Sequence, residues 1–348
     1  MARRLLLLAL VVAVIAGVAA ERSIKPSPDR SGDAAVEAAV RLERVNRRPA
    51  FALPSTPSPV PEEQGDGASE PVPSEAVPVQ VAPAEASPSV VDLAIAPVAG
   101  SDPAELTAQL LAAERGIRDP ASTPEQLAHF GHLQQVAYRA LVLHPDWDAA
   151  VSAALPEDLR PVMAANVGAG RELRRPVRVP QVTLPAWRIV EPAPAAELRA
   201  YYEEGEAAYG VPWQYLAAVN LTETRMGRIR GYSSAGARGP MQFIPGTWAR
   251  YGEGDIDDPH DAIMAAARYL SANGGTRDDM SNALFRYNPV SWYVDAVSAY
   301  AEQMVADERA YLGYYSWQVY FVTDLGDVLL PVGYASAEPR PVTPADLG

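Results

Sequence analysis

Three short stretches carry side chains that could act on a carbohydrate. Glu223 lies in a run of Asn-Leu-Thr-Glu-Thr, a glycine-rich segment follows at 234–242, and Tyr287-Asn288 comes later. A glycosidic bond breaks when an acid protonates the leaving oxygen and the sugar becomes oxocarbenium-like. The three stretches, in this order among helices, predict a chain that cuts a sugar–sugar bond with one buried carboxylic acid.

Glu223 is the candidate acid. Such a group must hold its proton near neutral pH, and burial among apolar groups raises the pKa of a carboxyl group. Apolar neighbours in the sequence, including Leu221 and Met226, favour that environment. The alternative is an exposed glutamate at a helix end that pairs with Arg225 or Arg228.

The glycine-rich segment is a candidate substrate-binding loop. Its glycines permit a tight turn and close approach of the backbone to a ligand. Gln242 offers an amide donor and acceptor, suited to an N-acetyl group or a sugar hydroxyl. Ser234 and Met241 lie in the same segment and are further candidates for substrate contact. The alternative is a surface turn that ends in a core methionine.

Tyr287 and Asn288 add a phenol and a second amide to the candidate site. Asn288 precedes Pro289, a pattern that also predicts an N-cap for a helix opening at the proline. The two roles are compatible if the helix begins facing the cleft.

An acidic loop lies between the second and third stretches. Glu253, Asp255, Asp257 and Asp258 are clustered there, and hydrolases that cut glycosidic bonds commonly use a second carboxylate. Asp258 precedes Pro259 and is more easily explained as an N-cap. The other acids are expected to be solvated, with a bound cation as the alternative.

Composition excludes several other classes of protein. The net charge of −14 argues against nucleic-acid binding, which needs clustered Lys and Arg. The chain has no cysteine, which excludes disulfides, thiolate metal sites and a cysteine nucleophile. His129 and His132 share a helix face, where a solvated surface is the ordinary interpretation and a metal pair the alternative. We expect no cofactor and no metal.

The N-terminal hundred residues contain no predicted catalytic part. Two arginines precede an apolar run over residues 5–20 that ends in small residues, which predicts a cleaved signal peptide or a membrane anchor over residues 1–20. The absence of a following cysteine excludes a lipoprotein. Residues 21–100 are rich in proline and lack apolar periodicity, so a disordered spacer is expected.

The remaining chain is predicted to be mainly helical. Helices are expected over 103–116, 124–141, 146–155 and 156–174, each opening at a proline or a capping residue, and they define a helical subdomain at 101–185. A connecting segment rich in proline follows. A second helical domain at 186–312 has expected helices at 195–209, 212–223, 245–251, 259–270, 281–287 and 289–305. An aromatic and β-branched run predicts a terminal β-hairpin within 313–336.

The motifs resemble those of a known family. The Glu223-Thr224 pair, the Gly-Ala-x-Gly-x-Met-Gln run and Tyr287-Asn288 are similar to lytic transglycosylases of the goose-lysozyme-like superfamily, over roughly residues 195–306. The tail at 288–294 looks most like membrane-bound B-type and secreted actinobacterial members. The resemblance implies a lysozyme-like fold and cleavage of peptidoglycan between N-acetylmuramic acid and N-acetylglucosamine.

The resemblance also implies residue roles. Glu223 would be acid and then base, Gln242 and Asn288 would contact the sugar, and Tyr287 would hydrogen-bond or position the acid. The product would carry a 1,6-anhydro ring on muramic acid, and the enzyme would act outside the cytoplasm. The partner would be the peptidoglycan strand, with a possible membrane tether through residues 5–20; the sequence does not indicate the oligomeric state.

Three alternatives remain open at this level. A muramidase of the same fold would release reducing ends with water. A non-catalytic glycan-binding protein would keep the cleft without turnover. The proline-rich segment alone would also suit a structural envelope protein.

Overall fold

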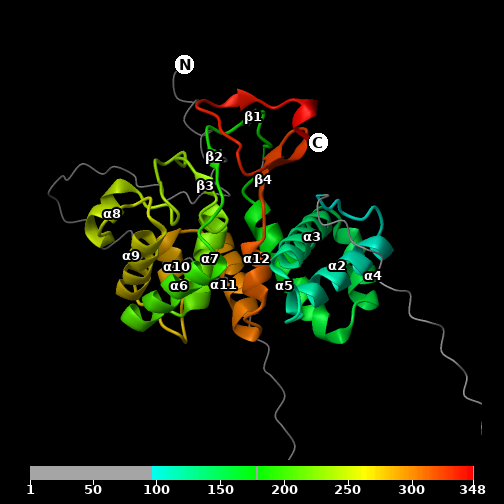
Figure 1. The fold of residues 1–348 in the computed structure, drawn as a ribbon, viewed down its shortest axis with the longest axis horizontal. Coiled ribbons are helices and arrows are strands. Elements are labelled where there is room, and N and C mark those ends of the chain that lie inside the picture. Colours follow the sequence, from blue (N-terminus) through cyan, green and yellow to red (C-terminus); the bar gives the residue numbers. More distant parts are fainter. Residues whose placement is uncertain (1–95, 178, 348) are drawn as a thin grey trace, which may run out of the picture. The chain divides into compact units, whose positions relative to one another are not determined.

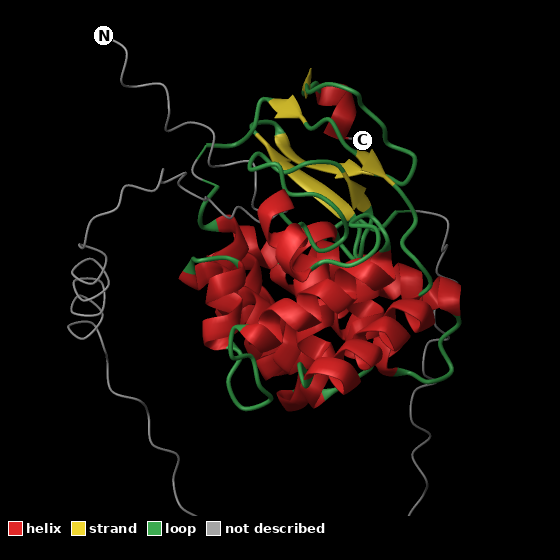
Figure 2. Ribbon diagram, turned by 90° about the vertical axis from the view of Figure 1, so that its left-hand side faces the viewer, coloured by secondary structure: helices red, strands yellow, loops and turns green. Residues whose placement is uncertain are grey.

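The computed structural model describes residues 96–177 and 179–347, and they form a mainly helical structure. Helices α2–α5 lie on one side and α8–α10 on the other, with α7, α11 and α12 between them (Figure 1). The strands form three two-stranded antiparallel ladders, β1 with β6, β2 with β3 and β4 with β5. They gather at one end of the helices (Figure 2).

The first two helices begin where the capping residues predict, whereas the next two begin later than the expected Asp146 and Pro156. α2 (Pro103–Arg118) opens at Asp102, whose side chain accepts hydrogen bonds from two backbone N–H groups of the first turn. α3 (Pro124–Leu143) opens with a complete capping box between Thr123 and Gln126. α4 (Asp148–Ala154) and α5 (Arg160–Arg174) follow, each after one turn of 3₁₀ helix.

The second group of helices surrounds α7. Every residue of α7 (Trp213–Thr224) except Tyr215 is buried, as expected of a helix apolar on all sides. It packs against α6 (Ala195–Tyr209), α9 (Pro259–Ala272), α11 (Ser291–Ala306) and α12 (Ala310–Tyr315). The shorter α8 (Pro245–Tyr251) and α10 (Ser281–Tyr287) pack on α9, and α10 also packs on α11.

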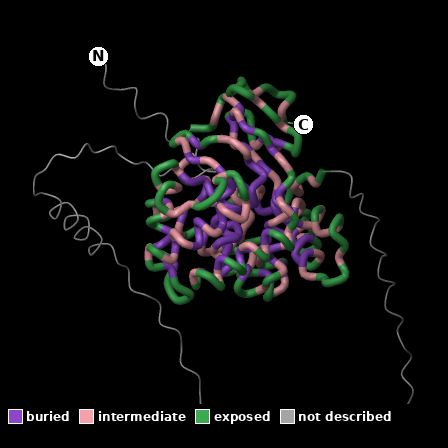
Figure 3. The backbone as a smooth tube through the Cα atoms, turned by 60° about the vertical axis from the view of Figure 1, so that its left-hand side comes forward, coloured by how far each residue is buried: buried purple, intermediate pink, exposed green. Residues whose placement is uncertain are grey.

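One hydrophobic core runs through both groups of helices. Leu106 and Leu141 from the first group belong to the same buried cluster as Leu216 and Ile263 from the second. A separate smaller cluster lies under the strands and includes Trp187 and Phe321. In Figure 3 the buried residues gather in the interior and the exposed ones lie mostly on the outside. The boundaries predicted at 101–185, 186–312 and 313–336 remain predictions.

The terminal hairpin is confirmed, with a later start. β4 (Val319–Thr323) pairs with β5 (Gly326–Leu330) across the turn expected near Asp324. Tyr315, expected in the first strand, ends α12 instead, because Tyr314 and Trp317 are needed in the helical core.

Four strands of two residues each were not predicted. β1 (Thr183–Leu184) pairs with β6 (Arg340–Pro341), and β2 (Arg188–Ile189) pairs with β3 (Ile229–Arg230). Two residues are too few for a period-2 pattern, and the partners are distant in sequence. Residues 344–347 form a terminal 3₁₀ turn.

The signal peptide or anchor at 1–20 and the spacer as far as residue 95 lie outside the described residues. At the start of the described chain, Gln109 of α2 donates from Nε2 to the Val98 carbonyl and accepts the Gly100 N–H, both at 2.8 Å. Ordered contacts thus begin at Val98, within the last residues assigned to the spacer. Among residues 96–177 and 179–347, no helix is long and apolar enough to cross a membrane.

Candidate active site

Glu223 lies in the last turn of the central helix, where the chain reverses sharply. The residue is 1% exposed. Arg225, Met226 and Gly227 follow with φ of 54°, 60° and 85°, a run in the left-handed region that ends α7 abruptly. Non-glycine residues occupy this region at a cost, so the surrounding contacts must hold the turn in place.

Thr224 and Asn220 fasten the glycine-rich loop to this helix end. The Thr224 hydroxyl donates to the Pro240 carbonyl at 2.5 Å, and Asn220 Nδ2 donates to the same oxygen at 2.8 Å. Tyr202 of α6 donates to Asn220 Oδ1 at 2.6 Å, and the Gly227 N–H donates to Thr224 Oγ1. The network is buried and fixes the loop beside Glu223.

The loop itself is a tight hairpin-like turn. Arg238 and Phe243 exchange both backbone hydrogen bonds, at 3.1 and 3.0 Å. Gly239, with φ of 79°, cannot be replaced without a shift of the backbone, because a Cβ there would lie 1.9 Å from the Ile256 carbonyl oxygen. Gln242 also has a left-handed φ of 51°. The turn thus sets the direction of the Gln242 side chain.

Two tyrosines connect the acid to the loop. The Tyr293 hydroxyl of α11 donates to Glu223 Oε1 at 2.7 Å, and the Tyr287 hydroxyl donates to the Met241 carbonyl at 2.5 Å. Their rings are parallel, with centroids 6.4 Å apart. Burial, followed by the charge of Glu223, raises the pKa of both phenols well above the usual value, so both remain donors at neutral pH.

The hydrogen bond expected from Tyr287 to the acid is thus found with Tyr293. Sequence reasoning missed Tyr293 as a site residue. A signal was present, since Tyr293 shares the apolar face of α11 with Ala296, Val297 and Tyr300, and a buried phenol needs a hydrogen-bond partner.

The two candidate amides each have one buried polar atom without a partner. Gln242 Nε2 donates to the Gly239 carbonyl at 3.1 Å, while Oε1 has no protein hydrogen bond. Asn288 is 2% exposed, and its Nδ2 has no hydrogen bond among the described residues. Buried polar atoms are rarely left unpaired. An acceptor and a donor are therefore available to a ligand.

The N-cap role expected for Asn288 is wrong. α11 begins at Ser291 with Val290 as its N-cap, and the Asn288 side chain caps neither helix. Its backbone N–H donates to Leu284, which ends α10. The first-turn N–H groups of Tyr293 and Val294 donate to the Val290 carbonyl, so the helix starts after Pro289, and the Asn288 amide is left for another purpose.

The two remaining candidates differ in exposure. The Met241 side chain is fully buried in the core, and its carbonyl is the group bonded to Tyr287. Ser234 is exposed at the tip of the loop. Its neighbour Ser233 holds the loop, accepting the N–H groups of Ala235 and Ala237 on its hydroxyl oxygen. Hydrogen bonds join Glu223 to Tyr293 and Tyr287 to Met241. Gln242 directly follows Met241 in the sequence, and Asn288 directly follows Tyr287.

Comparison with known proteins agrees with this arrangement. Residues 200–302, which include Glu223, Gln242, Tyr287, Asn288 and Tyr293, match the family model described as Transglycosylase SLT domain. This part of the chain is a transglycosylase SLT domain. The chain is also similar to membrane-bound lytic murein transglycosylase F of Thiobacillus denitrificans, at 32% identity over 75 residues.

That similarity covers a small part of each protein. The 75 residues are 22% of this chain and 16% of the relative. No solved structure matches the chain. The SLT domain is mainly helical, as expected for a lysozyme-like domain, and the small terminal hairpin follows it in the chain. The particular likeness to B-type and secreted actinobacterial members stays a prediction.

The acidic loop of the SLT domain is tied to arginines rather than wholly solvated. Asp257 forms an ion pair with Arg238, and Glu253 one with Arg268 at 3.2 Å. Asp258 is confirmed as an N-cap, since its side chain accepts the Asp261 N–H. These partners give the acids structural roles in positioning the loop after α8.

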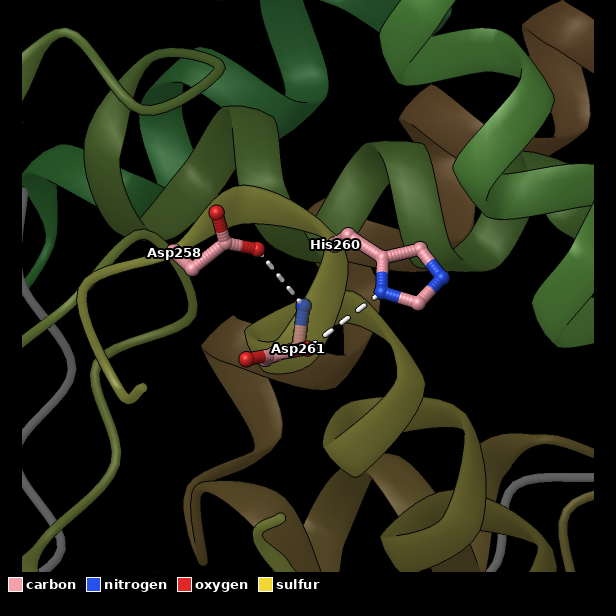
Figure 4. Close-up of side chains that lie close together, drawn as sticks. All are labelled: Asp258, His260 and Asp261. Atoms are coloured by element: carbon pink, nitrogen blue, oxygen red, sulfur yellow. Dashed lines mark hydrogen bonds and ion pairs between the residues drawn. The ribbon is translucent and has the colours of Figure 1, made fainter. Parts of the chain in front are cut away.

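Asp258, His260 and Asp261 are close enough to share a metal ion (Figure 4). Their atoms have other partners, however: His260 Nε2 lies 3.2 Å from Glu204, and Asp261 accepts the Asp255 N–H. His132 is also engaged, since its Nε2 lies 2.8 Å from the Tyr320 hydroxyl, so the solvated face expected around it is wrong for this residue.

An open groove borders the glycine-rich loop on the strand side. It encloses about 610 Å³ of solvent space and is lined by Arg188, Arg230, Arg238, Gly239 and Asp257, among others. Because Gly239 and Arg238 belong to the loop that carries Gln242, the groove adjoins the candidate substrate-binding segment.

Proposed function

We propose that this chain is a peptidoglycan lytic transglycosylase that cleaves the β-1,4 bond between N-acetylmuramic acid and N-acetylglucosamine. The observation that carries the proposal is the buried Glu223, held by Tyr293, in an SLT domain whose Gln242 and Asn288 keep unpaired polar atoms. The name of the transglycosylase F relative supports murein as the substrate.

Glu223 would act first as a general acid. Its proton passes to the glycosidic oxygen as the bond to C1 of muramic acid breaks, and the developing positive charge lies on the ring oxygen and C1. Tyr293 would hold the carboxyl group in place through its short hydrogen bond to Oε1. An acid that is fixed in this way is positioned to meet the geometric need of acid catalysis.

The same carboxylate would then act as a base. The C6 hydroxyl of muramic acid attacks C1 and gives its proton to Glu223, so the product carries a 1,6-anhydro ring and the enzyme is restored. An intramolecular hydroxyl competes well against water because of its effective concentration. No second catalytic carboxylate is needed, which agrees with the structural partners of Asp257, Asp258 and Glu253.

Gln242 and Asn288 would bind the sugar. Gln242 Oε1 can accept from an amide N–H or a hydroxyl, and Asn288 Nδ2 can donate to a carbonyl or hydroxyl oxygen. Together they match the two ends of an acetamido group. Met241 contributes its backbone, through Tyr287, rather than its side chain. Ser234, exposed at the loop tip, remains a proposed substrate contact.

The place of action would be the cell wall outside the cytoplasm, in keeping with the membrane-bound relative. A signal peptide or tether at residues 1–20 and a spacer after it complete this proposal.

The decisive experiment is mass analysis of soluble fragments released from purified sacculi. Anhydro products should be lighter by one water, about 18 mass units, than the matching hydrolysis products, because ring closure replaces water. Reducing-end muramic acid would favour the muramidase alternative. Binding to sacculi without release of fragments would favour a non-catalytic glycan-binding protein.

A further inference from the structure

A second cavity is lined by residues of α3, α5, α11 and β4, together with Arg225 at the end of the Glu223 helix. Its volume is about 80 Å³, enough for several water-sized groups. The walls are mostly apolar and aromatic, and they include Val142, Leu173, Trp317, Phe321 and Val322. None of the candidate glycan-binding residues lines it.

Arg225 brings an unusual charge into this cavity. Its side chain is 7% exposed and lines the cavity wall. Nη1 donates to the Leu221 carbonyl at 2.6 Å, while Nε is buried without a partner. Among the described residues, no carboxylate forms an ion pair with Arg225, whose pKa burial lowers to about 10. The group is therefore still cationic at neutral pH.

The neighbouring charges do not neutralise the positive charge of Arg225. Arg139 and Arg174 also line the cavity, and both bind Asp327; Arg174 does so with two hydrogen bonds, at 2.9 and 3.0 Å. Among the residues described here, Arg139 and Arg174 thus share one carboxylate and Arg225 has none. A buried charge without a partner is costly, which leaves a deficit of negative charge at Arg225.

A hydroxyl and an aromatic wall complete the site. Tyr300 is 2% exposed, lines the cavity near Arg225, and its hydroxyl has no hydrogen-bond partner in the described part of the chain. Its ring meets that of Trp317 edge to face, with centroids 5.5 Å apart. A flat apolar group could lie against these rings while an anionic end reaches the polar corner.

We propose that this cavity binds a small monocarboxylate with a flat apolar body, its carboxylate on Arg225 and Tyr300. A cation would be repelled, and a neutral apolar molecule would leave the guanidinium with its contacts to the Leu221 carbonyl and the Trp317 ring but without an anionic partner. Since Arg225 directly follows Glu223 and Thr224 and holds the left-handed end of α7, an occupant would stabilise the turn that positions the acid. The site is separate from the proposed glycan site.

The test is calorimetric titration of the full-length chain with benzoate and with neutral benzamide, which has nearly the same shape. Benzoate should bind saturably, and benzamide about tenfold more weakly or less, because a hydrogen bond to a charged group is lost. Equal binding of the two, or no saturable binding of benzoate, would overturn the proposal.

Two variants locate the binding. Arg225→Met removes the charge, and Val322→Trp fills the cavity from the half-buried face of β4. Each should weaken benzoate binding about tenfold or more. Arg250→Gln, on the exposed side of α8, is the control and should bind as the unaltered chain does. If Arg225→Met fails to fold, Val322→Trp still decides: unchanged affinity in that variant would show that benzoate binds elsewhere.

Discussion

Buried side-chain amides are fully hydrogen-bonded in the helices of the first segment but only partly hydrogen-bonded near the glycine-rich loop. Gln134 donates to Glu114 at 3.0 Å and accepts the Trp317 indole N–H at 2.9 Å. Gln135 donates to and accepts from the backbone of Gln318, at 2.9 and 2.8 Å. Both ends of each amide are used, and the contacts join α3 to the segment that leads into the hairpin.

Gln242 and Asn288 are as deeply buried, yet each keeps one polar atom without a partner. Completed networks stabilise a fold, whereas an unpaired buried atom costs stability unless a ligand completes it. The difference separates structural amides from candidate binding amides. Gln214 Oε1 is also unpaired, and nothing in the structure explains it.

The two buried glutamates show the same contrast. Glu114 and Glu223 are each 1% exposed. Glu114 accepts from Tyr138 and Gln134 and forms an ion pair with Arg118, an arrangement suited to a charge that stays fixed. Glu223 accepts a phenol hydroxyl from Tyr293. The Tyr293 hydroxyl is a neutral donor, whereas the Arg118 guanidinium beside Glu114 carries a positive charge.

The largest expected effect comes from exchanging the two glutamates for glutamine. Glu223→Gln removes the transferable proton and keeps the size, so release of muropeptides should fall by about 10²–10⁴ or more. Its melting temperature should change little, because glutamine can still accept from Tyr293.

Glu114→Gln is the matched control. It removes one of the two ion pairs of Arg118, which keeps its pair with Asp307, and should lower the free energy of unfolding by about 2 kcal/mol while activity per folded molecule persists. Similar activity losses in both variants, measured on purified sacculi, would contradict the assignment of Glu223.

The second prediction concerns pH and the hairpin contact of His132. Burial, together with the nearby charges of His129 and Arg228, lowers the pKa of His132 to about 4. The unfolded chain binds this proton near pH 6.5, whereas the folded chain does so only near pH 4. The contribution of the neutral His132 imidazole to the free energy of unfolding is therefore fully present above pH 6.5. It is lost as pH falls from 6.5 to 4, by up to about 3 kcal/mol.

Thermal unfolding of His132→Gln should accordingly depend less on pH between 7 and 4.5 than that of the unaltered chain. His129 is on the same helix and is only half-buried, and His129→Gln serves as the control. Parallel pH curves for the His132 variant and the unaltered chain would show that the buried imidazole does not cause the pH dependence of stability.

The third prediction tests the amide comparison directly. Gln242→Ala and Asn288→Ala should each lower kcat/KM by an amount that corresponds to about 1–3 kcal/mol of lost transition-state stabilisation, since substrate groups would lose their partners. Their melting temperatures should hardly fall, because the atoms removed bond little within the protein.

Gln134→Ala should have the opposite effect, on stability rather than on activity. It leaves Glu114 and the Trp317 indole without a bond and should cost about 1–3 kcal/mol of stability at unchanged kcat/KM. A stability loss for Asn288→Ala as large as that for Gln134→Ala would mean that Asn288 is structural.

The smallest effect is expected at the N-terminal boundary. A chain that starts at Asp92 should fold and act on purified glycan as well as the full chain. One that starts at Ser101 loses the two hydrogen bonds of Gln109 with Val98 and Gly100, and should be less stable by about 1–2 kcal/mol. Loss of activity in the Asp92 chain would show that the preceding segment takes part in catalysis.

Local signals in the sequence determined much of the helical architecture. Asp102, Thr123 and Asp258 cap helices as predicted, because a short polar side chain before a proline satisfies the first free N–H groups whatever the tertiary context. Glu223, Gln242 and Asn288 could be selected as candidates for the same reason: their types and order are properties of the chain alone.

Only the tertiary structure decided how those candidates are used. Tyr293 rather than Tyr287 meets Glu223, and Asn288 keeps a free amide instead of capping α11. The short ladders of β1 with β6 and β2 with β3 also lacked a local signal. Each of these depends on which distant segment packs beside a given group. Sequence spacing specifies the face of one helix, but the partner across that face is chosen by the packing of the whole core.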